Sequence, residues 1–278
     1  MLSIIIPTRD RADCLATCLE ALARQSSPDV FEVIVADDNR FGPLQIPTGL
    51  PFAVATTRAT QRGAAPARMA AVAVARSDLL GFLDDDAVPD TGWVAQALAR
   101  RETLLTAPIA ITGRILPLQD RLLSQARQAR YDARQDAARA RGGRCDFLAG
   151  GNAIIAATTF TAAGGFDCSM DMMHDAALLA AITAMGGYCL YDEHLVIRHL
   201  HVKSAGDAVL NAYRSGGHRL RILEAKGETI PIACEAVTSL ARLRAISTDR
   251  VDAVNAALNL VHLTGATIFK LSDGRWPR

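Results

Sequence analysis

The sequence has little of what a nucleic-acid-binding protein needs. Aromatic residues make up 5% of its 278 residues, and its charged residues nearly cancel to a formal net charge of +1. Without a strong positive field or aromatic stacking surfaces, we expect no nucleic-acid partner. No apolar run reaches the roughly 18 residues that a membrane-spanning helix needs. The most apolar late segment, 251–271, is interrupted by Asp252, Asn255, Asn259, His262 and Lys270.

The cysteines also lack a pattern. The six cysteines contain no Cys-x-x-Cys pair and no regular spacing, so neither a metal-binding cluster nor a secreted disulfide framework is indicated. The chain opens directly on the apolar segment MLSIIIP instead of a signal peptide. These features predict reduced thiols and a cytoplasmic location.

Three familiar nucleotide-binding loops are missing after this first apolar segment. A dinucleotide-binding oxidoreductase needs Gly-x-Gly-x-x-Gly there, and the sequence reads Pro7-Thr8-Arg9-Asp10 instead. A Walker P-loop is absent. The glycine-rich basic loop that usually opens a sugar-nucleotide uridylyltransferase is absent as well. These three classes are therefore disfavoured.

The first 105 residues alternate between apolar, strand-like segments and segments with a helical pattern. Strands are expected at 2–7, 30–36, 52–57 and 79–83, and helices at 12–24, 64–76 and 93–105. This order predicts an α/β fold with a mostly parallel sheet flanked by helices. Further strands are expected at 109–116, 147–157, 188–191 and 195–197, and further helices at 121–141, 158–163 and 172–185. From 207 the pattern is helical (207–225, 231–246 and 249–271) and predicts a C-terminal extension.

The most informative segment is 79–90, LLGFLDDDAVPD, in which a buried strand ends on three aspartates. Ligands of open α/β sheets bind at this kind of strand end. Alternate side chains of an extended chain share a face, so Asp84 and Asp86 should converge and Asp85 should point away. Two converging carboxylates repel unless a cation lies between them or one is protonated. Oxygen ligands suit Mg²⁺ or Mn²⁺. A solvated turn with Asp90 as a helix N-cap is the alternative interpretation.

The longer segment 62–93 that contains these aspartates (RGAAPARMAAVAVARSDLLGFLDDDAVPDTGW) and four others together resemble family 2 glycosyltransferases of GT-A fold over residues 2–201. The other four are SIIIPTRDR (3–11), VIVADDNR (33–40), the 147–182 segment with its Gly-Gly-Asn and Gly-Gly-Phe-Asp, and His-Leu-His at 199–201. The resemblance implies a Rossmann-like catalytic domain over 1–206. Its nucleotide-binding half would be 1–106 and its acceptor half 107–206, followed by a helical region at 207–278.

The resemblance also implies functional residues. Those on the nucleotide-sugar side would be Pro7, Thr8, Arg9, Asp37, Asp38, Arg68, Asp84, Asp85, Gly151 and Asn152. Asp84 and Asp86 match the D-x-D pair that holds Mn²⁺ or Mg²⁺. His199 is expected to complete the coordination, with His201 as the alternative. Met69 and Ala71 depart from the family pattern, where Asn and Gly are usual.

The family's catalytic base lies in a Glu-Asp pair, and the matching pair in this sequence is His174-Asp175. Asp175 matches the base, and His174 replaces the usual Glu. This change is interpreted in three ways: a tolerated exposed substitution, a residue that tunes Asp175 or meets a different acceptor, or a sign of weakened activity.

The implied reaction is metal-dependent and inverting, and it moves one sugar from a nucleotide sugar to an acceptor hydroxyl. UDP-sugars are the favoured donors, with dTDP- and GDP-sugars as alternatives. The acceptor could be a lipid-linked sugar, a glycan, a metabolite or a peptide. No Q-x-x-R-W motif follows Asp175, which argues against processive polymer growth. The alternative is a degenerate nucleotide-sugar-binding or scaffold protein without turnover.

Basic residues beside apolar faces in the C-terminal helices leave two options open. A homodimer or packing contact is favoured, and peripheral binding to the cytoplasmic membrane face is the minority view.

Overall fold

The computed structural model describes residues 1–26, 30–170, 172–201, 204–225, 227–244 and 249–272. They divide into two compact units. Unit 1 comprises 1–116 and 133–199, and unit 2 comprises 117–132 and 200–278. Each unit is described by itself.

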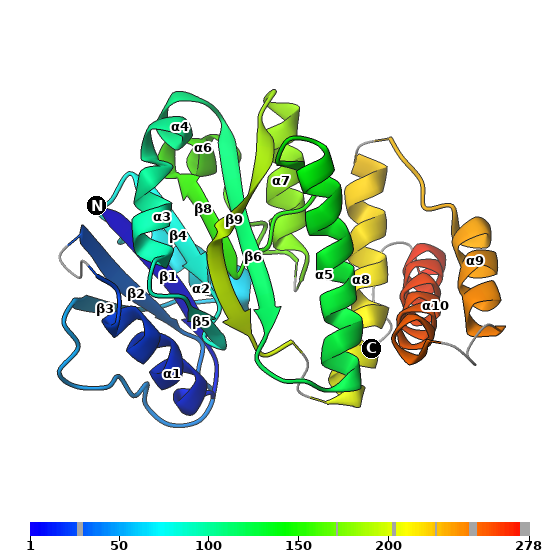
Figure 1. Ribbon diagram of the computed structural model, residues 1–278, viewed down its shortest axis with the longest axis horizontal. Helices are drawn as coiled ribbons and strands as arrows, with labels where there is room; N and C mark the ends of the chain where they lie inside the picture. The colour runs from blue at the N-terminus through cyan, green and yellow to red at the C-terminus, as the bar shows by residue number, and fades with distance from the viewer. Residues whose placement is uncertain (27–29, 171, 202–203, 226, 245–248, 273–278) are drawn as a thin grey trace. The chain divides into compact units, whose positions relative to one another are not determined.

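Unit 1 is built on a mixed sheet (Figure 1), in which nine strands are found among the described residues. The strands are β1 (Leu2–Thr8), β2 (Phe31–Asp37), β3 (Ala53–Arg58), β4 (Leu79–Leu83), β5 (Ala87–Pro89), β6 (Ile109–Pro117), β7 (Arg144–Cys145), β8 (Asn152–Ala156) and β9 (Tyr188–His199). Their order is β3-β2-β1-β4-β8-β6-β9-β5, with β7 paired to β9. All seven residues of β1 are buried, as expected for a strand covered on both faces.

The two halves of this sheet pair differently. Strands β3, β2, β1 and β4 run parallel. Helices connect β1 to β2 and β3 to β4, as is usual for parallel strands, whereas residues 38–52, which join β2 to β3, contain no helix. Strand β8 is antiparallel to β4 and to β6, and β5 and β7 are antiparallel to β9. The α/β class with flanking helices is confirmed, and its parallel part is confined to the first half of the chain.

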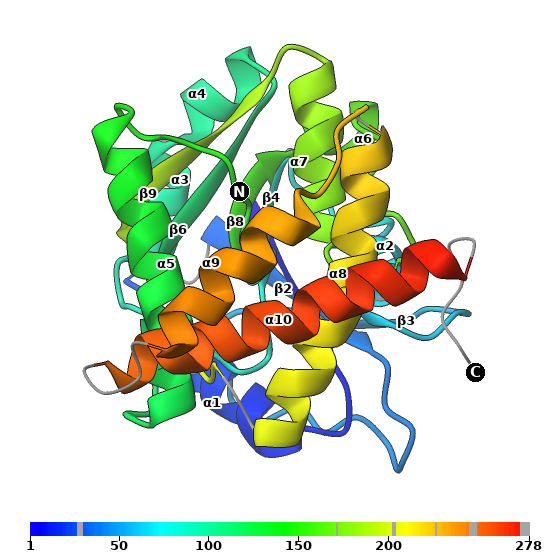
Figure 2. The same cartoon turned by 90° about the vertical axis from the view of Figure 1, so that its right-hand side faces the viewer.

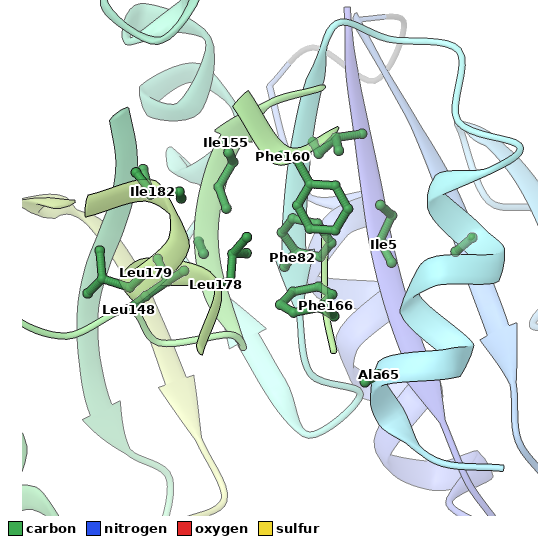
Figure 3. Packing of buried hydrophobic residues seen from close by; sticks show 14 of the residues in the cluster. Ile5, Ala65, Phe82, Leu148, Ile155, Phe160, Phe166, Leu178, Leu179 and Ile182 are labelled. Carbon is green, nitrogen blue, oxygen red and sulfur yellow. The ribbon is translucent and has the colours of Figure 1, made fainter. Parts of the chain in front are cut away.

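Helices cover both faces of the sheet. They are α1 (Ala12–Ala23), α2 (Ala64–Val72), α3 (Trp93–Ala99), α4 (Arg101–Thr106), α6 (Ala157–Ala162) and α7 (His174–Ala184), together with the second part of α5 (Leu122–Ala140). In Figure 1, α1 and α3 lie in front of the sheet. Figure 3 shows the core on the face covered by α2, α6 and α7, where Phe82, Phe160 and Phe166 pack together.

Unit 2 is helical. It comprises α8 (Ala205–Ala225), α9 (Ile232–Arg244), α10 (Arg250–Leu271) and the first part of α5. Figure 2 shows α10 crossing α8. Two glycines make this approach possible, because a Cβ on Gly216 would lie 1.9 Å from the His262 carbonyl oxygen, and one on Gly265 would lie 1.8 Å from that of Tyr213. Within the described part of the chain, no helix is both long and apolar enough to cross a membrane.

Three local expectations were wrong. The helix expected at 93–105 is divided at Arg100 into α3 and α4. The strands expected at 188–191 and 195–197 form one strand, β9. The segment after Asp86 pairs as β5, and the N-cap of α3 is Gly92, with no side-chain cap from Asp90.

Candidate functional site

The parallel strands place several polar residues at one edge of the sheet. β1 and β2 end at Thr8 and Asp37, and β4 ends immediately before Asp84. The backbone N–H of Asp38 donates to the Thr8 carbonyl (2.9 Å), and the Thr8 hydroxyl donates to Asp85 (2.8 Å). The carboxyl ends of three neighbouring strands therefore meet where ligands of open α/β sheets bind.

Asp84, Asp86 and His199 form a compact cluster at this edge. His199 Nε2 lies 3.0 Å from Asp86 Oδ1 and 3.4 Å from Asp84 Oδ2, and one ligand atom of each residue lies within 4.8 Å of the others. The antiparallel pairing of β5 with β9 sets Ala87 opposite His199 and so brings the histidine to the aspartates. Two carboxylates and one imidazole fit a divalent cation such as Mn²⁺ or Mg²⁺.

The three aspartates are balanced by three cationic groups. Arg11 forms ion pairs with Asp85 and Asp86, and Arg68 pairs with Asp84 at 2.5 Å. Burial disfavours a charged His199, but the hydrogen bonds and charges of Asp84 and Asp86 outweigh burial and raise its pKa to about 10. A metal ion that binds here must therefore displace a proton from His199.

The carboxylates respond to the same neighbours. Although burial opposes ionisation, Arg68 and His199 hold the pKa of Asp84 well below its usual range, and His199 lowers that of Asp86. The extended chain expected over Asp84–Asp86 is wrong, because Asp85 and Asp86 lie in a turn in which the Ala87 N–H donates to the Asp84 carbonyl (3.1 Å). The Asp85 side chain is fully buried against Thr8 and Arg11. Burial, only partly offset by Arg11, raises the pKa of Asp85 to about 6.

Two consecutive glycines separate the acidic cluster from Asp175. The Gly150 backbone N–H donates to Asp175 Oδ2 (3.3 Å). Gly151 lies against Asp84, since a Cβ at this position would be 2.2 Å from Asp84 Oδ2. The structure thus brings Asp175, at the start of α7, close to the residue predicted to bind metal.

His174 is not an exposed residue. It is 7% exposed, and its Nε2 lies 2.5 Å from Arg68 Nη1. Its ring packs edge-on against Phe166, with centroids 5.0 Å apart. The interpretation of His174 as a tolerated exposed substitution is wrong.

Four of the residues predicted to surround the nucleotide lie at or near the ends of β1 and β2. Arg9 lies 3.7 Å from Asp38, and Asp38 accepts from the Gly63 backbone N–H (3.2 Å). Asp37 lies 3.5 Å from Arg58. Pro7 is buried within β1.

Two other predicted residues have partners elsewhere. Asn152 Oδ1 accepts from the Trp93 indole (2.8 Å), and Nδ2 donates to the carbonyls of Arg114 and Leu195, so its amide serves the packing of the sheet. In unit 2, His201 Nε2 lies 2.8 Å from Gln128 Oε1, and its ring packs against Tyr131.

Sequence reasoning assigned no role to Arg11 and did not foresee the contact between Arg68 and His174. Arg11 immediately precedes the helix that follows β1, and that position at the carboxyl edge was the available signal. The Arg68–His174 contact joins residues 106 positions apart, and no local pattern indicates it.

Comparison with known proteins identifies the class. The model of the family described as "Glycosyl transferase family 2" matches residues 3–155, more than half of the chain. The chain belongs to this family.

One curated relative and several solved structures are similar. The relative, from Haemophilus influenzae, is named "Uncharacterized glycosyltransferase" and is 38% identical over 87 residues. The match covers 31% of this chain and only 29% of that relative's length.

The solved structures share the GT-A fold at low identity. A mannosyltransferase, PcManGT from Pyrobaculum calidifontis in complex with GDP-Man and Mn²⁺, has a TM-score of 0.70 at 17% identity, covering 99% of this chain and 88% of that one. TarS 1–349 of S. aureus in complex with UDP-GlcNAc has a TM-score of 0.53 at 12% identity, covering 100% and 93%.

Proposed function

We propose that this chain transfers one sugar from a nucleotide-sugar donor to an acceptor hydroxyl, with inversion at the anomeric carbon and with a divalent metal ion. The observation that carries the proposal is the Gly150–Gly151 bridge. Gly150 donates to Asp175 and Gly151 touches Asp84, so a candidate base and a candidate metal ligand lie on either side of a backbone segment without side chains.

The donor end consists of the acidic cluster and its arginines. Asp84, Asp86 and His199 would hold Mn²⁺ or Mg²⁺, and the imidazole ligand favours Mn²⁺, because Mg²⁺ prefers oxygen ligands. When bound, the metal supplies Lewis-acid stabilisation to the diphosphate leaving group. Arg11 and Arg68 are the protein's own cations at this end, and they would also donate to phosphate oxygens of the donor.

Asp175 would act as the general base. It accepts backbone hydrogen bonds from Gly150 and Ala176, which fix the carboxylate and leave lone pairs for an acceptor proton. Attack by the acceptor from the face opposite the leaving diphosphate inverts the anomeric centre. The transition state is oxocarbenium-like, as in glycoside chemistry generally.

The donor base would be read at the ends of β1 and β2. Arg9, Asp37 and Asp38 lie there, and Asp38 is tied to the loop before α2 through Gly63. We favour UDP-sugars, and the similarity to a mannosyltransferase solved with GDP-Man makes GDP-sugars the first alternative. The acceptor is proposed only as a hydroxyl compound, with a lipid-linked sugar as one class.

The test is incubation of the full chain with UDP-GlcNAc and with GDP-mannose, with Mn²⁺ or EDTA, and with candidate acceptors. We expect metal-dependent release of nucleoside diphosphate and a product whose anomeric configuration, measured by NMR, is opposite to that of the donor. Retention of configuration would contradict the inverting mechanism. Release that is equal in EDTA would contradict the metal site.

A further inference from the structure

Arg68 lies between the acidic cluster and the start of α7. Its side chain is 5% exposed. One guanidinium nitrogen, Nη2, donates to Asp84 Oδ1 at 2.5 Å, and Nη1 lies 2.5 Å from Nε2 of His174. A single buried guanidinium therefore contacts both sides of the site.

The chemistry of this contact fixes the state of His174. Arginine does not lose its proton in proteins and has only donor groups. Nε2 of His174 must therefore accept the hydrogen bond, so the imidazole is neutral and carries its proton on Nδ1. A second cation at 2.5 Å from the guanidinium would be strongly repelled.

The start of α7 needs such a contact. Met173 precedes the helix in the left-handed region, with φ of 60°, and provides no side-chain cap. A non-glycine residue in this conformation persists only where its surroundings hold it. His174 is the first residue of the helix and Asp175 the second, so the hydrogen bond from Arg68 fixes the turn that carries the candidate base.

A shared aromatic surface holds both partners. The Arg68 guanidinium lies over the Phe166 ring at 5.6 Å, and the His174 ring meets the same ring edge-on. Phe166 is itself held by Phe82 and Phe160 in the core (Figure 3). The guanidinium and the imidazole are therefore positioned by packing as well as by their own contact.

We propose that His174 is a positioning residue: as a neutral imidazole it accepts from Arg68 and ties the position of Asp175 to the metal-binding carboxylate Asp84. This inference rests on the proposed function. It gives the replacement of an acid by histidine a specific role, because His174 is an acceptor for Arg68 that does not neutralise its charge. That charge is thus left for Asp84 and the donor diphosphate.

The test compares His174→Phe, which keeps an aromatic ring against Phe166 but cannot accept, with His174→Gln, whose amide oxygen can accept. His194→Phe is the matched control, because His194 is an exposed histidine of the same unit. Each variant is assayed for Mn²⁺-dependent binding of UDP-GlcNAc or GDP-mannose by calorimetry, and for release of nucleoside diphosphate.

For His174→Phe we expect release to fall by about 10²-fold, the effect of a small misplacement of a reacting group, with donor Kd unchanged. His174→Gln should recover most of the rate, and His194→Phe should match the wild type. An unchanged rate in His174→Phe, a Kd that weakens in parallel with the rate, or a failed recovery by His174→Gln would overturn the positioning role.

Two further readouts separate the possible failures. Ring-nitrogen NMR of the wild type should show His174 Nε2 without a proton, and a protonated Nε2 overturns the proposal even if His174→Phe does not fold. Absence of metal-dependent donor binding in the wild type would overturn the proposed function and the positioning role together. Normal wild-type binding with an unaffected His174→Phe overturns the positioning role alone.

Discussion

Gly151 lies against the carboxylate of Asp84 so closely that a Cβ on its backbone would stand 2.2 Å from Oδ2. The backbone of Gly151 is outside the left-handed region, so glycine is needed here for the space and not for the conformation. This contact limits where the Asp84 side chain can lie, and it sets the distance between the acidic cluster and Asp175.

Gly151→Ala should therefore disturb Asp84 while leaving the fold intact. The added methyl group must displace the carboxylate, and we expect Mn²⁺ affinity to fall by about 10–100-fold, as when other groups that orient metal ligands are altered. Calorimetric titration with Mn²⁺ measures this directly. The matched control is Gly92→Ala, where a Cβ meets nothing within 4 Å. Equal affinities of the two variants would show that the contact has no role in metal binding.

The two late histidines should differ sharply. His199 contacts Asp84 and Asp86, whereas His201 pairs with Gln128 in unit 2. His199→Ala should weaken Mn²⁺ binding by more than about 100-fold, because loss of a metal ligand costs more affinity than loss of a group that only orients a ligand, which costs about 10–100-fold. His201→Ala should leave Mn²⁺ affinity unchanged. The reverse order of effects in the same titration would assign the metal to His201.

Asp175→Asn should separate turnover from binding. The amide cannot accept the acceptor proton as a base, so we expect kcat to fall by about 10²–10⁴-fold. Donor Kd should stay the same, because Asp175 lies beyond the glycine bridge from the cluster. If Asp86→Ala abolishes donor binding and Asp175→Asn never changes turnover, the nucleotide-sugar-binding scaffold becomes the better account.

The ion pair of buried Glu32 with Arg76, at the start of β2 and away from the strand ends that carry the site, should make stability depend on pH. Glu32 accepts from Ser3 and from the backbone and side chain of Arg76. Burial opposes ionisation, but these partners outweigh it and lower the pKa of Glu32. Its stabilisation is therefore complete above the unfolded pKa of about 4.3 and is lost as pH falls through the lower folded value.

Glu32→Gln should consequently cost about 1–2 kcal/mol near pH 7, a value kept low because Arg76 is largely exposed. Melting temperatures of wild type and variant should differ steadily above about pH 5 and converge below about pH 4. A difference that stays constant down to about pH 3 would show that the charge of Glu32 is not what stabilises the fold.

Local sequence patterns predicted the strand at 79–83 that ends at the three aspartates. They did not predict the turn that follows it, in which the Ala87 N–H donates to the Asp84 carbonyl, so the alternation of an extended chain does not explain why Asp85 lies outside the cluster. The order of strands and helices predicted a parallel arrangement of β1, β2 and β4.

Contacts between distant segments explain what the patterns missed. Strand β9 runs unbroken through polar Asp192, because that carboxylate accepts from Gln96 and Arg100. The same arginine marks the break between α3 and α4. The local sequence pattern around Asp192 does not indicate a contact with Arg100, and the pattern around Arg100 does not indicate a contact with Asp192.

The choice between His199 and His201 depended on register. Pairing of β5 with β9 places Ala87 opposite His199, and β5 was not expected from the sequence. The role of Asn152 was hidden in the same way, since its indole partner Trp93 is 59 residues away.

The most direct test of the central claim is a thermal shift of wild type and Asp86→Ala with UDP-, dTDP- and GDP-sugars, each with Mn²⁺ and with EDTA. A ligand that binds the folded state at 100 times its Kd stabilises it by about 2.7 kcal/mol. We expect one nucleotide class to raise the melting temperature of the wild type with Mn²⁺. The shift should be absent in EDTA and absent in Asp86→Ala. No shift with any donor in the presence of metal would contradict a metal-dependent nucleotide-sugar site.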